Sequence, residues 1–329
     1  MPEATAYGSS FSRVVAIANP RSAAGRTAKR WPAIRTELAA RGIEVEVQMT
    51  SGPGDATGLA RQALTNGHDL VVAVGGDGTI NEVVNGFFAE DGAAINSDAA
   101  LAVIPSGSGG DFRRSAGIPA DFASAVAVIA EGVTHRCDVG RIEATGGGDA
   151  RHFINIADCG VGGEVAARVN AGRGKRFGGT PAFFYHSMAV LMTYRARRVE
   201  IELDGEVLER SVQNVVIANG RYFGGGMMVA PQARLDDGIF DVVIINAASR
   251  LQTARDLPSV YRGHHIGRNG VELRRARSVK VRELAGEKAL RFEAEGEEFG
   301  ATPATITCLA GAIRLCAGRG AAGGTILPD

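Results

Sequence analysis

A glycine-rich turn is the first place in the chain where residue types and spacing indicate chemistry. Gly75, Gly76 and Gly78 surround Asp77 and are followed by Thr79. Glycines free the backbone from Cβ constraints, so a bulky anion can approach main-chain N–H groups. A carboxylate among such groups is best explained if a cation or a transferable proton is bound as well. The alternative is a strand-to-helix turn without a ligand, because glycines punctuate many α/β folds.

The segments on either side of this turn predict the elements that hold it. Leu70–Val74 is a short apolar run with three valines, typical of a strand buried on both faces of a parallel sheet. Thr79 and Glu82 have the spacing of a capping box, which predicts a helix start. A phosphate over the turn would meet unpaired N–H donors and the positive end of a helix dipole. The apolar residues that follow at helical spacing are Ile80, Val83, Val84 and Phe87.

Two further loops follow predicted strands and have a similar character. Ser106–Phe112 combines small residues with the Ser108 hydroxyl and the Asp111 carboxylate, and Asn19–Arg26 is polar and follows the strand Val14–Ala18. Ligands of parallel sheets sit at the carboxyl ends of the strands. We therefore expect the three loops to converge on one site.

The order of predicted elements indicates two domains. Strands alternate with helices up to about Glu131, which predicts an α/β domain with a parallel sheet over residues 1–136. Short strands with little helix follow, so residues 137–317 should form a β-rich, mainly antiparallel, sandwich-like domain whose last strand can return to the first domain, and 318–329 a tail. A hairpin turn is expected at Asp204-Gly205. The other predicted elements are helices 27–41, 121–131, 181–194 and 249–262, and strands 43–49, 101–104, 138–143, 151–159, 199–207, 211–219 and 239–246.

Composition excludes several classes of protein. The chain has 329 residues, zero formal net charge and a pI near 7.0, so the total charge gives no argument for nucleic-acid binding. Its four cysteines form no CxxC pair, which argues against a zinc site or a disulfide framework. Neither an N-terminal signal nor an apolar run of about 18 residues is visible. The sequence thus predicts a cytoplasmic protein without a transmembrane segment.

Two acidic segments lie in the second half of the chain. Asp236 and Asp237 precede a glycine, and a type I turn and a cation site explain them about equally well. Glu293–Glu298 has four acids in six positions. A solvated hairpin is the plain interpretation of this second segment, and a general base is the sharper one.

Together these segments resemble a known family. GGDGTINEVVNG at Gly75–Gly86, IPSGSGGDF at Ile104–Phe112, the Asn19–Ser22 loop and ARLDDGIFDV at Ala233–Val242 are similar to the bacterial diacylglycerol kinase-like lipid kinases, in the superfamily of diacylglycerol and sphingosine kinases. The resemblance covers roughly residues 13–317 in order. NAD kinases share the first turn but lack the second loop. The implied fold is NAD kinase/diacylglycerol kinase-like.

The resemblance implies that ATP donates a phosphoryl group to a lipid hydroxyl, with Mg²⁺ as cofactor. Asp77 and Asp111 would work near the phosphates, with Asp77 and Glu297 as catalytic residues and Glu297 as the proton acceptor. Asp237 and the carbonyls of Arg234 and Ile239 would bind a second Mg²⁺, and Asp138 would be linked to that site. The residues implied to line the nucleotide are Asn19, Pro20, Arg21, Ser22, Ala23, Thr50, Gly76, Asp77, Gly78, Thr79, Ile80, Asn81, Glu82 and Ser108.

The sequence departs from the usual family pattern in two of these motifs. Ser108 and Gly110 occur where the family usually has Thr and Asn, and Glu295 occurs where it commonly has Asp. Two alternatives therefore stay open: an NAD kinase-like enzyme that phosphorylates a soluble hydroxyl, and a catalytically silent nucleotide or lipid binder.

A lipid substrate implies contact with a membrane surface, which without a spanning helix must be peripheral, at the inner face of the membrane. Basic clusters at 173–176, 195–198 and 274–282 could add up to about 1 kcal/mol per charge against an anionic leaflet, although solvated element ends are the commoner explanation. The sequence leaves the oligomeric state open, a homodimer included.

Overall fold

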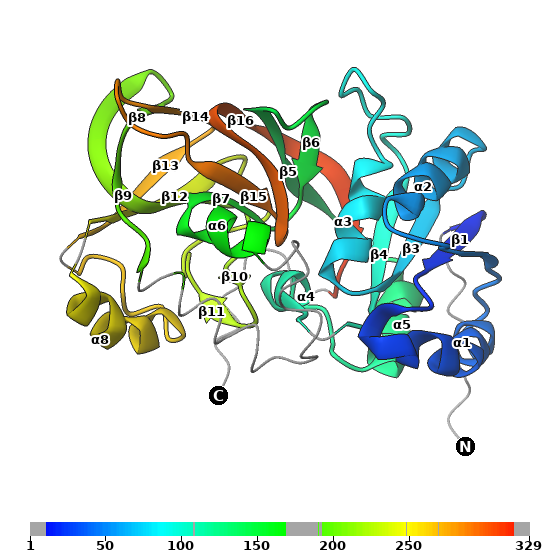
Figure 1. Cartoon of the computed structure of the whole chain (residues 1–329). Helices are drawn as coiled ribbons and strands as arrows, with labels where there is room; N and C mark the ends of the chain where they lie inside the picture. Colours follow the sequence, from blue (N-terminus) through cyan, green and yellow to red (C-terminus); the bar gives the residue numbers. More distant parts are fainter. Residues whose placement is uncertain are drawn as a thin grey trace. The chain divides into compact units, whose positions relative to one another are not determined.

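The computed structural model describes residues 11–107, 109–168, 190, 193–247, 249–268 and 270–318 (Figure 1). The chain divides into two units, the first running up to Asp138 and again from Ala310, the second from Val139 to Leu309. Two strands cross this division: β5 (Thr134–Thr145) leaves the first unit and β16 (Glu297–Cys316) returns to it. Residues 319–329 of the predicted tail lie outside the described part.

The sheet of the first unit is parallel, as predicted. Its order is β2–β1–β3–β4 followed by the end of β16, where Arg314 and Leu315 pair with β4. Apolar runs make every residue of β1 and β3 buried, as expected for strands covered on both faces. The other bounds are β1 (Val14–Ala18), β2 (Glu46–Met49), β3 (Leu70–Gly75) and β4 (Ala100–Pro105).

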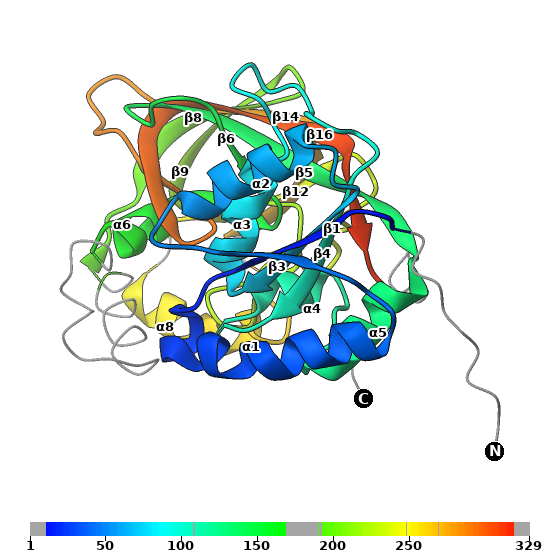
Figure 2. The same ribbon diagram turned by 90° about the vertical axis from the view of Figure 1, so that its right-hand side faces the viewer.

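Helices cover both faces of this sheet. Helices α1 and α5 pack against each other, as do α2 and α3, and Figure 2 shows the sheet between the two pairs. Ile34 and Leu38 of α1 and Ile129 of α5 meet the valines and alanines of β1, β3 and β4 in one buried core. The bounds are α1 (Ser22–Ala40), α2 (Asp55–Thr65), α3 (Asp77–Asn85), α4 (Asp111–Ser115) and α5 (Phe122–Glu131).

Three local predictions for this unit need correction. Helix α3 begins at Asp77 with Gly76 as an N-cap that makes no side-chain bond, so the predicted capping box of Thr79 and Glu82 is wrong. Helix α1 begins at Ser22 but is interrupted by left-handed residues up to Gly25, and only then becomes regular. Strand β2 covers only the last four residues of the predicted 43–49, because its pairing with β1 at the sheet edge begins at Glu46.

The second unit is built from antiparallel strands, as predicted. Strands β9, β8, β14, β16, β15 and β7 pair in this order, and β7 pairs again with β9, so the ring of strands closes. Closure pairs strand edges that would otherwise be exposed. The bounds are β7 (Ile156–Gly160), β8 (Arg197–Leu203), β9 (Glu206–Ala218), β14 (Ser278–Glu283) and β15 (Arg291–Ala294).

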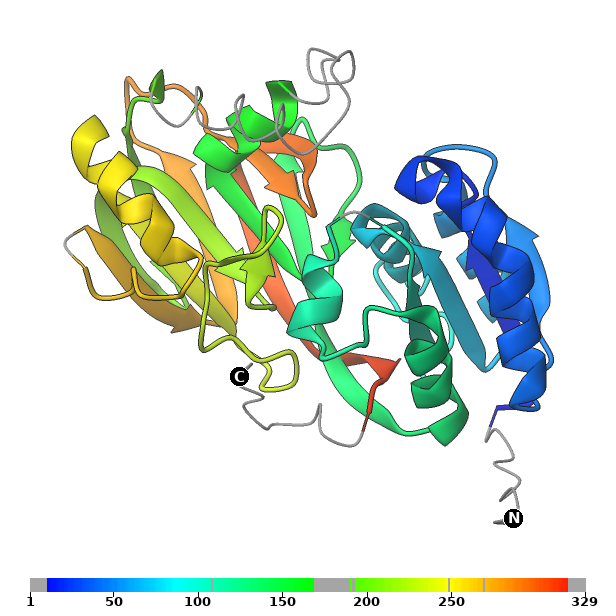
Figure 3. The ribbon, with the colours of Figure 1, turned by 90° about the horizontal axis from the view of Figure 1, so that it is seen from below.

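The remaining elements extend this ring. Strand β6 pairs with β5, while β12 and β13 continue outward from β9. Figure 3 shows the whole chain from below, with α6 in green and α8 in yellow. Among the described residues, 22 buried ones form the main core of the unit, with Phe153, Phe240 and Phe292 among them. The bounds are β6 (Arg151–Phe153), β10 (Tyr222–Phe223), β11 (Met227–Met228), β12 (Phe240–Asn246), β13 (Val271–Ala276), α6 (Val161–Arg168) and α8 (Arg250–Val260).

Most strand and helix predictions for this unit agree with the structure. Asp204-Gly205 forms the expected hairpin turn, and Ser249 caps α8 by accepting the N–H of Gln252 at 3.2 Å. The predicted single strand 151–159 is wrong, since it divides into β6 and β7 at Ile154-Asn155, whose N–H groups bond to Glu295 instead of a strand. Most of the predicted helix 181–194 lies outside the described residues.

Candidate active site

The structure brings together the three loops that follow β1, β3 and β4. The loops after β3 and β4 touch through their main chains, because a Cβ on Gly107 would lie only 2.5 Å from the Cα of Gly76. The loop after β1 joins them through Asn19, whose Nδ2 donates to the Oγ1 of Thr79 at 3.0 Å. Small residues at the carboxyl ends of parallel strands thus create a surface of main-chain groups.

Asp77 braces the loop after β4. Its Oδ2 accepts the N–H groups of Gly110 at 2.8 Å and Asp111 at 3.3 Å, and its Oδ1 accepts that of Phe112 at 3.3 Å. Hydrogen bonds to an ionised acceptor are about twice as strong as neutral ones. The position of the loop therefore depends on the Asp77 carboxylate, and the main-chain donors of α3 are left to face an anion.

The hydroxyl group of Thr27, which sequence reasoning missed, ties the first loop to the third. The Oγ1 of Thr27 lies 2.5 Å from the Oγ of Ser22 and 2.5 Å from the Oγ of Ser106, and Thr27 is fully buried. Thr27 and Ser106 are 79 residues apart in the chain. No local pattern signals such a contact, because it depends on the parallel order of β1, β3 and β4.

The loop after β1 has an unusual backbone. Ala23, Ala24 and Gly25 have φ values of 51°, 57° and 82°, in the left-handed region. A right-handed residue followed by a left-handed one turns successive N–H groups to one side, which forms a concave anion site. Non-glycine residues in this region store strain of about 1–3 kcal/mol each, which is typical of functional loops.

The other residues assigned to the nucleotide have different surroundings. Thr50 is buried and its N–H donates to Ala18 at the end of β1. The Glu82 carboxylate accepts the N–H of Ala56 at 3.2 Å, so it joins α3 to α2. Ile80 is part of the buried interior, and the buried Oδ1 of Asn81 accepts no hydrogen bond from the described residues.

The remaining assigned residues of this loop cluster also have clear positions. The Oδ1 of Asp111 accepts a hydrogen bond from Arg114 at 2.7 Å. The N–H of Arg21 donates to the Oδ1 of Asn19 at 3.0 Å, across Pro20. Ser108 lies outside the described residues.

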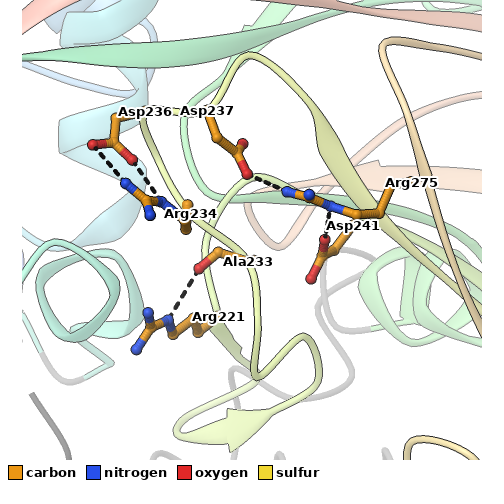
Figure 4. Close-up of polar contacts among 7 residues, drawn as sticks. All are labelled: Arg221, Ala233, Arg234, Asp236, Asp237, Asp241 and Arg275. Carbon is orange, nitrogen blue, oxygen red and sulfur yellow. Dashed lines mark hydrogen bonds and ion pairs between the residues drawn. The ribbon is translucent and has the colours of Figure 1, made fainter. Parts of the chain in front are cut away.

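In the loop predicted to bind a second metal ion, at Arg234–Ile239, the acids are paired with arginines. Arg234 pairs with Asp236 at 3.1 Å, while Arg275 of β13 binds both Asp237 and Asp241 (Figure 4). Asp241 is buried, and burial raises the pKa of its carboxyl. Sequence reasoning placed Arg275 in a basic cluster and not beside Asp237, because the two residues are 38 positions apart.

A cation still fits this loop. The Oδ1 of Asp237 and the Oδ2 of Asp241 are buried and accept no hydrogen bond from the described residues. Arg221 also acts on Asp241 and Arg234 on Asp237, so these unbonded oxygens, and not an excess of negative charge, are what would attract a cation. Among the described residues no three His, Cys, Asp or Glu side chains form a metal cluster, so further ligands would be main-chain carbonyls, as assigned for Arg234 and Ile239. Asp138 lies in the first unit, where its Oδ1 accepts the N–H of Gly311 at 2.6 Å.

The turn between β15 and β16 carries the assigned proton acceptor. Glu297 is the first residue of β16, with its side chain 56% exposed and 3.4 Å from the guanidinium of Arg151. Glu295 and Gly296 have φ values of 56° and 82°, as a two-residue hairpin turn requires. The Glu295 carboxylate accepts the N–H groups of Ile154 at 2.9 Å and Asn155 at 2.7 Å.

Comparison with known proteins identifies the family. Residues 13–142 match the model of the diacylglycerol kinase catalytic domain, and residues 155–317 match that of the YegS C-terminal NAD kinase beta sandwich-like domain. A diacylglycerol kinase of Bacillus subtilis is 32% identical over 294 residues, which cover 89% of this chain and 92% of that protein. The chain belongs to the diacylglycerol kinase family. A diacylglycerol kinase of Staphylococcus carnosus is 30% identical over 290 residues, which cover 88% of this chain and 90% of that protein.

Solved structures of the diacylglycerol kinase family share the fold. A putative diacylglycerol kinase from Bacillus anthracis aligns with a TM-score of 0.77 at 24% identity, over 95% of this chain and 99% of its own. As a member of the diacylglycerol kinase family, the chain is a kinase. Each helix among the described residues is too short or too polar to cross a lipid bilayer.

Replacing Gly107 by alanine should disrupt the contact between the two glycine loops of this family member. The new methyl group would lie 2.5 Å from the main chain of Gly76, which cannot move as a side chain could. We expect overpacking to destabilise the fold by about 1–3 kcal/mol, measured by denaturant unfolding. Gly52→Ala is the matched control, because a Cβ there meets no atom within 4 Å. Equal effects of the two substitutions would contradict the close approach.

Proposed function

We propose that this kinase transfers the γ-phosphoryl group of ATP to the hydroxyl group of a lipid. The observation that carries the proposal is the meeting of three main-chain loops at the carboxyl ends of β1, β3 and β4, with donors free to face phosphates. The relatives named diacylglycerol kinase support a lipid as the acceptor.

The chemistry requires little covalent help from the protein. Phosphoryl transfer depends mainly on positioning and on neutralising charge, which main-chain N–H groups and cations can supply. In the proposed step the lipid hydroxyl attacks the γ-phosphorus, ADP leaves, and Glu297 takes the hydroxyl proton. Asp77 contributes by holding the loop that begins α4 against the start of α3.

Mg²⁺ would supply positive charge to the phosphates and, at a separate place, hold the loop that follows Ala233. Asp237 would provide a carboxylate ligand there through its unbonded Oδ1, with the carbonyls of Arg234 and Ile239 beside it. Because arginines already offset the charge of Asp237 and Asp241, we propose a structural role for this second ion.

If Asp237 is a ligand of the second ion, its neighbour Asp236 should not be needed for metal binding. Mg²⁺ should raise the midpoint of thermal unfolding of the wild type and of Asp236→Asn, because Asp236 is committed to Arg234. Asp237→Asn should lose most of that rise, since its amide replaces a negatively charged ligand. Thermal unfolding with Mg²⁺ or with a chelator measures the difference. If Mg²⁺ still raised the unfolding midpoint of Asp237→Asn but not that of Asp236→Asn, the ion would be assigned to Asp236 instead.

We propose that the lipid is reached by peripheral contact with a membrane surface. Several basic residues of the second unit are paired with acids: Lys280 with Glu202 at 2.9 Å and Arg282 with Glu200 at 2.5 Å are examples. Such pairs have little net charge, so they attract an anionic leaflet less than the sequence alone suggests. The cluster at 173–176 lies outside the described residues.

Incubation with γ-labelled ATP tests the proposal directly. The acceptor panel contains vesicles with diacylglycerol, vesicles without it, and NAD as a soluble hydroxyl compound. Label in a vesicle lipid that depends on Mg²⁺ is the expected result. Label in NAD would replace the lipid assignment by a soluble acceptor, and bound nucleotide without any transfer would indicate a silent binder.

A further inference from the structure

Two acids that no role above uses lie side by side inside the second unit. Asp158 of β7 and Glu293 of β15 are direct partners across the antiparallel pair. Asp158 is 0% exposed and Glu293 5% exposed. Side chains at directly opposed positions of such a pair stand only about 5 Å apart at Cβ. Two ionised carboxylates so close together and without water would repel each other strongly.

The surroundings provide no cation for this pair among the described residues. Arg291, two residues before Glu293, binds Glu164 of α6 at 3.5 Å and also pairs with Glu298. The titratable group that acts on the pair from the turn is Glu295, which is also acidic.

Two further elements face Asp158 with uncharged groups. From β9 comes the Asn214 amide and from α6 the N–H of Gly163. Gly162 of α6 lies directly over the acid, since a Cβ there would be 2.1 Å from its Oδ1. Among the residues that the structure describes, α6 and β9 therefore enclose the pair without adding a positive charge.

Asp158 and Glu293 differ in their hydrogen bonds, and the difference indicates which of the two carries a proton. Both oxygens of Asp158 are buried and have no hydrogen-bond donor of good geometry in the described part of the chain. The Oε2 of Glu293 accepts the N–H of Gly296 at 2.5 Å. A neutral Glu293 would satisfy both observations, because its carbonyl oxygen accepts that N–H and its O–H can donate to Asp158.

We propose that Glu293 keeps its proton in the folded chain, donates it in a hydrogen bond to Asp158, and thereby positions the turn that carries Glu295 and Glu297. Glu293 and Asp158 are positioning residues in this scheme. The second part rests on the proposed function, in which Glu297 accepts the proton of the lipid hydroxyl. Loss of the shared proton would leave two buried negative charges, and their repulsion would displace Glu293 and with it the turn at Gly296.

The direction of the pKa shifts agrees with this arrangement. Burial, together with the neighbouring Asp158, raises the pKa of Glu293 well above its usual value, and burial raises that of Asp158 to about 6. Above pH 6 the pair therefore holds one proton that the unfolded chain has released. A raised folded-state pKa stabilises the fold most at low pH, and this contribution is lost as pH rises.

The first experiment compares the unfolding equilibria of the wild type and Glu293→Gln across pH. Glutamine imitates the protonated acid, since its amide donates to Asp158 and its carbonyl accepts from Gly296. The ratio of the two unfolding constants, wild type over variant, should rise about tenfold per pH unit between about pH 6.5 and pH 8.5, until the pKa of Glu293 is passed. Glu206→Gln, on the exposed start of β9, is the control and should give a constant ratio. A constant ratio for Glu293→Gln as well would overturn the shared proton.

The second experiment follows kcat against pH. Wild-type kcat should fall at high pH as the pair ionises, whereas Glu293→Gln should keep its neutral-pH kcat to higher pH. Glu293→Ala, which cannot accept from Gly296, should lose kcat with KM for ATP little changed. If that variant does not fold, Asp158→Asn replaces it and should also remove the high-pH fall. Identical high-pH falls in Glu293→Gln and the wild type would overturn the positioning role.

These measurements separate this inference from the proposed function. A wild-type protein that transfers no phosphoryl group to any acceptor would overturn the proposed function. The unfolding comparison would still decide the shared proton. The exchange rate of the Gly296 amide would then report the turn in place of kcat, with faster exchange at high pH in the wild type than in Glu293→Gln.

Discussion

Replacing Asp77 by asparagine should abolish turnover, with kcat reduced by ~100-fold or more, because displacing reacting groups by about 1 Å has that effect. The carboxylate accepts three N–H groups of residues 110–112 through two oxygens, and asparagine retains one acceptor and adds an N–H₂ group that opposes them. The loop after β4 would then lose its position against α3. Initial rates with labelled ATP, together with an unfolding midpoint, measure the effect.

The control is an aspartate that also accepts a main-chain N–H but lies away from the three loops. Asp91 accepts the N–H of Ala93 at 3.0 Å in an exposed turn. Asp91→Asn should leave kcat within about twofold of the wild type, as expected for a surface change. Wild-type turnover in Asp77→Asn would show that the brace is not needed for catalysis.

Glu297→Gln should lower kcat by about 10²–10⁴-fold, the usual contribution of a general base. The amide keeps the size of the side chain but cannot take a proton from the attacking hydroxyl. The affinity for ATP should be nearly unchanged, because a general base acts on the acceptor hydroxyl and not on the nucleotide; the ion-pair partner of Glu297 is Arg151. Losing that exposed ion pair costs at most about 1 kcal/mol, so the fold should persist.

Glu298→Gln provides the neighbouring control for this substitution. Glu298 pairs with Arg291 on β15, so its loss should affect stability slightly and kcat little. A split in which kcat falls and KM for ATP stays constant indicates an interaction made only in the transition state. Wild-type kcat in Glu297→Gln would remove this residue from the role of base and would leave Glu295 as the nearest candidate.

The fold of the first unit could be predicted closely because its signals are local. The valine-rich runs of β1 and β3 end at glycine or asparagine, and the structure places both strands within one residue of the expected bounds. The break between β6 and β7 could not be predicted. It depends on Glu295, 140 residues away, which takes the N–H of Asn155 out of the strand pattern.

The candidate site shows the same division between local and distant causes. The glycine-containing loops follow strands predicted to be parallel, and this pattern was enough to predict that the three loops would meet. The partners of the acids could not be predicted: Asp77 faces main-chain N–H groups, and Asp237 faces Arg275 from another strand. Thr27 had no signal of its own, since its importance comes from Ser106 across the sheet.

The return of β16 to the first unit constrains how the protein can be made. Residues 310–316 supply the strand that pairs with β4, and they leave the ribosome after the whole second unit has been synthesised. Until then β4 presents an unpaired edge, the kind of surface on which chains aggregate. A gene fragment that ends near residue 138 would keep that edge permanently, so the first unit is expected to fold poorly when expressed alone.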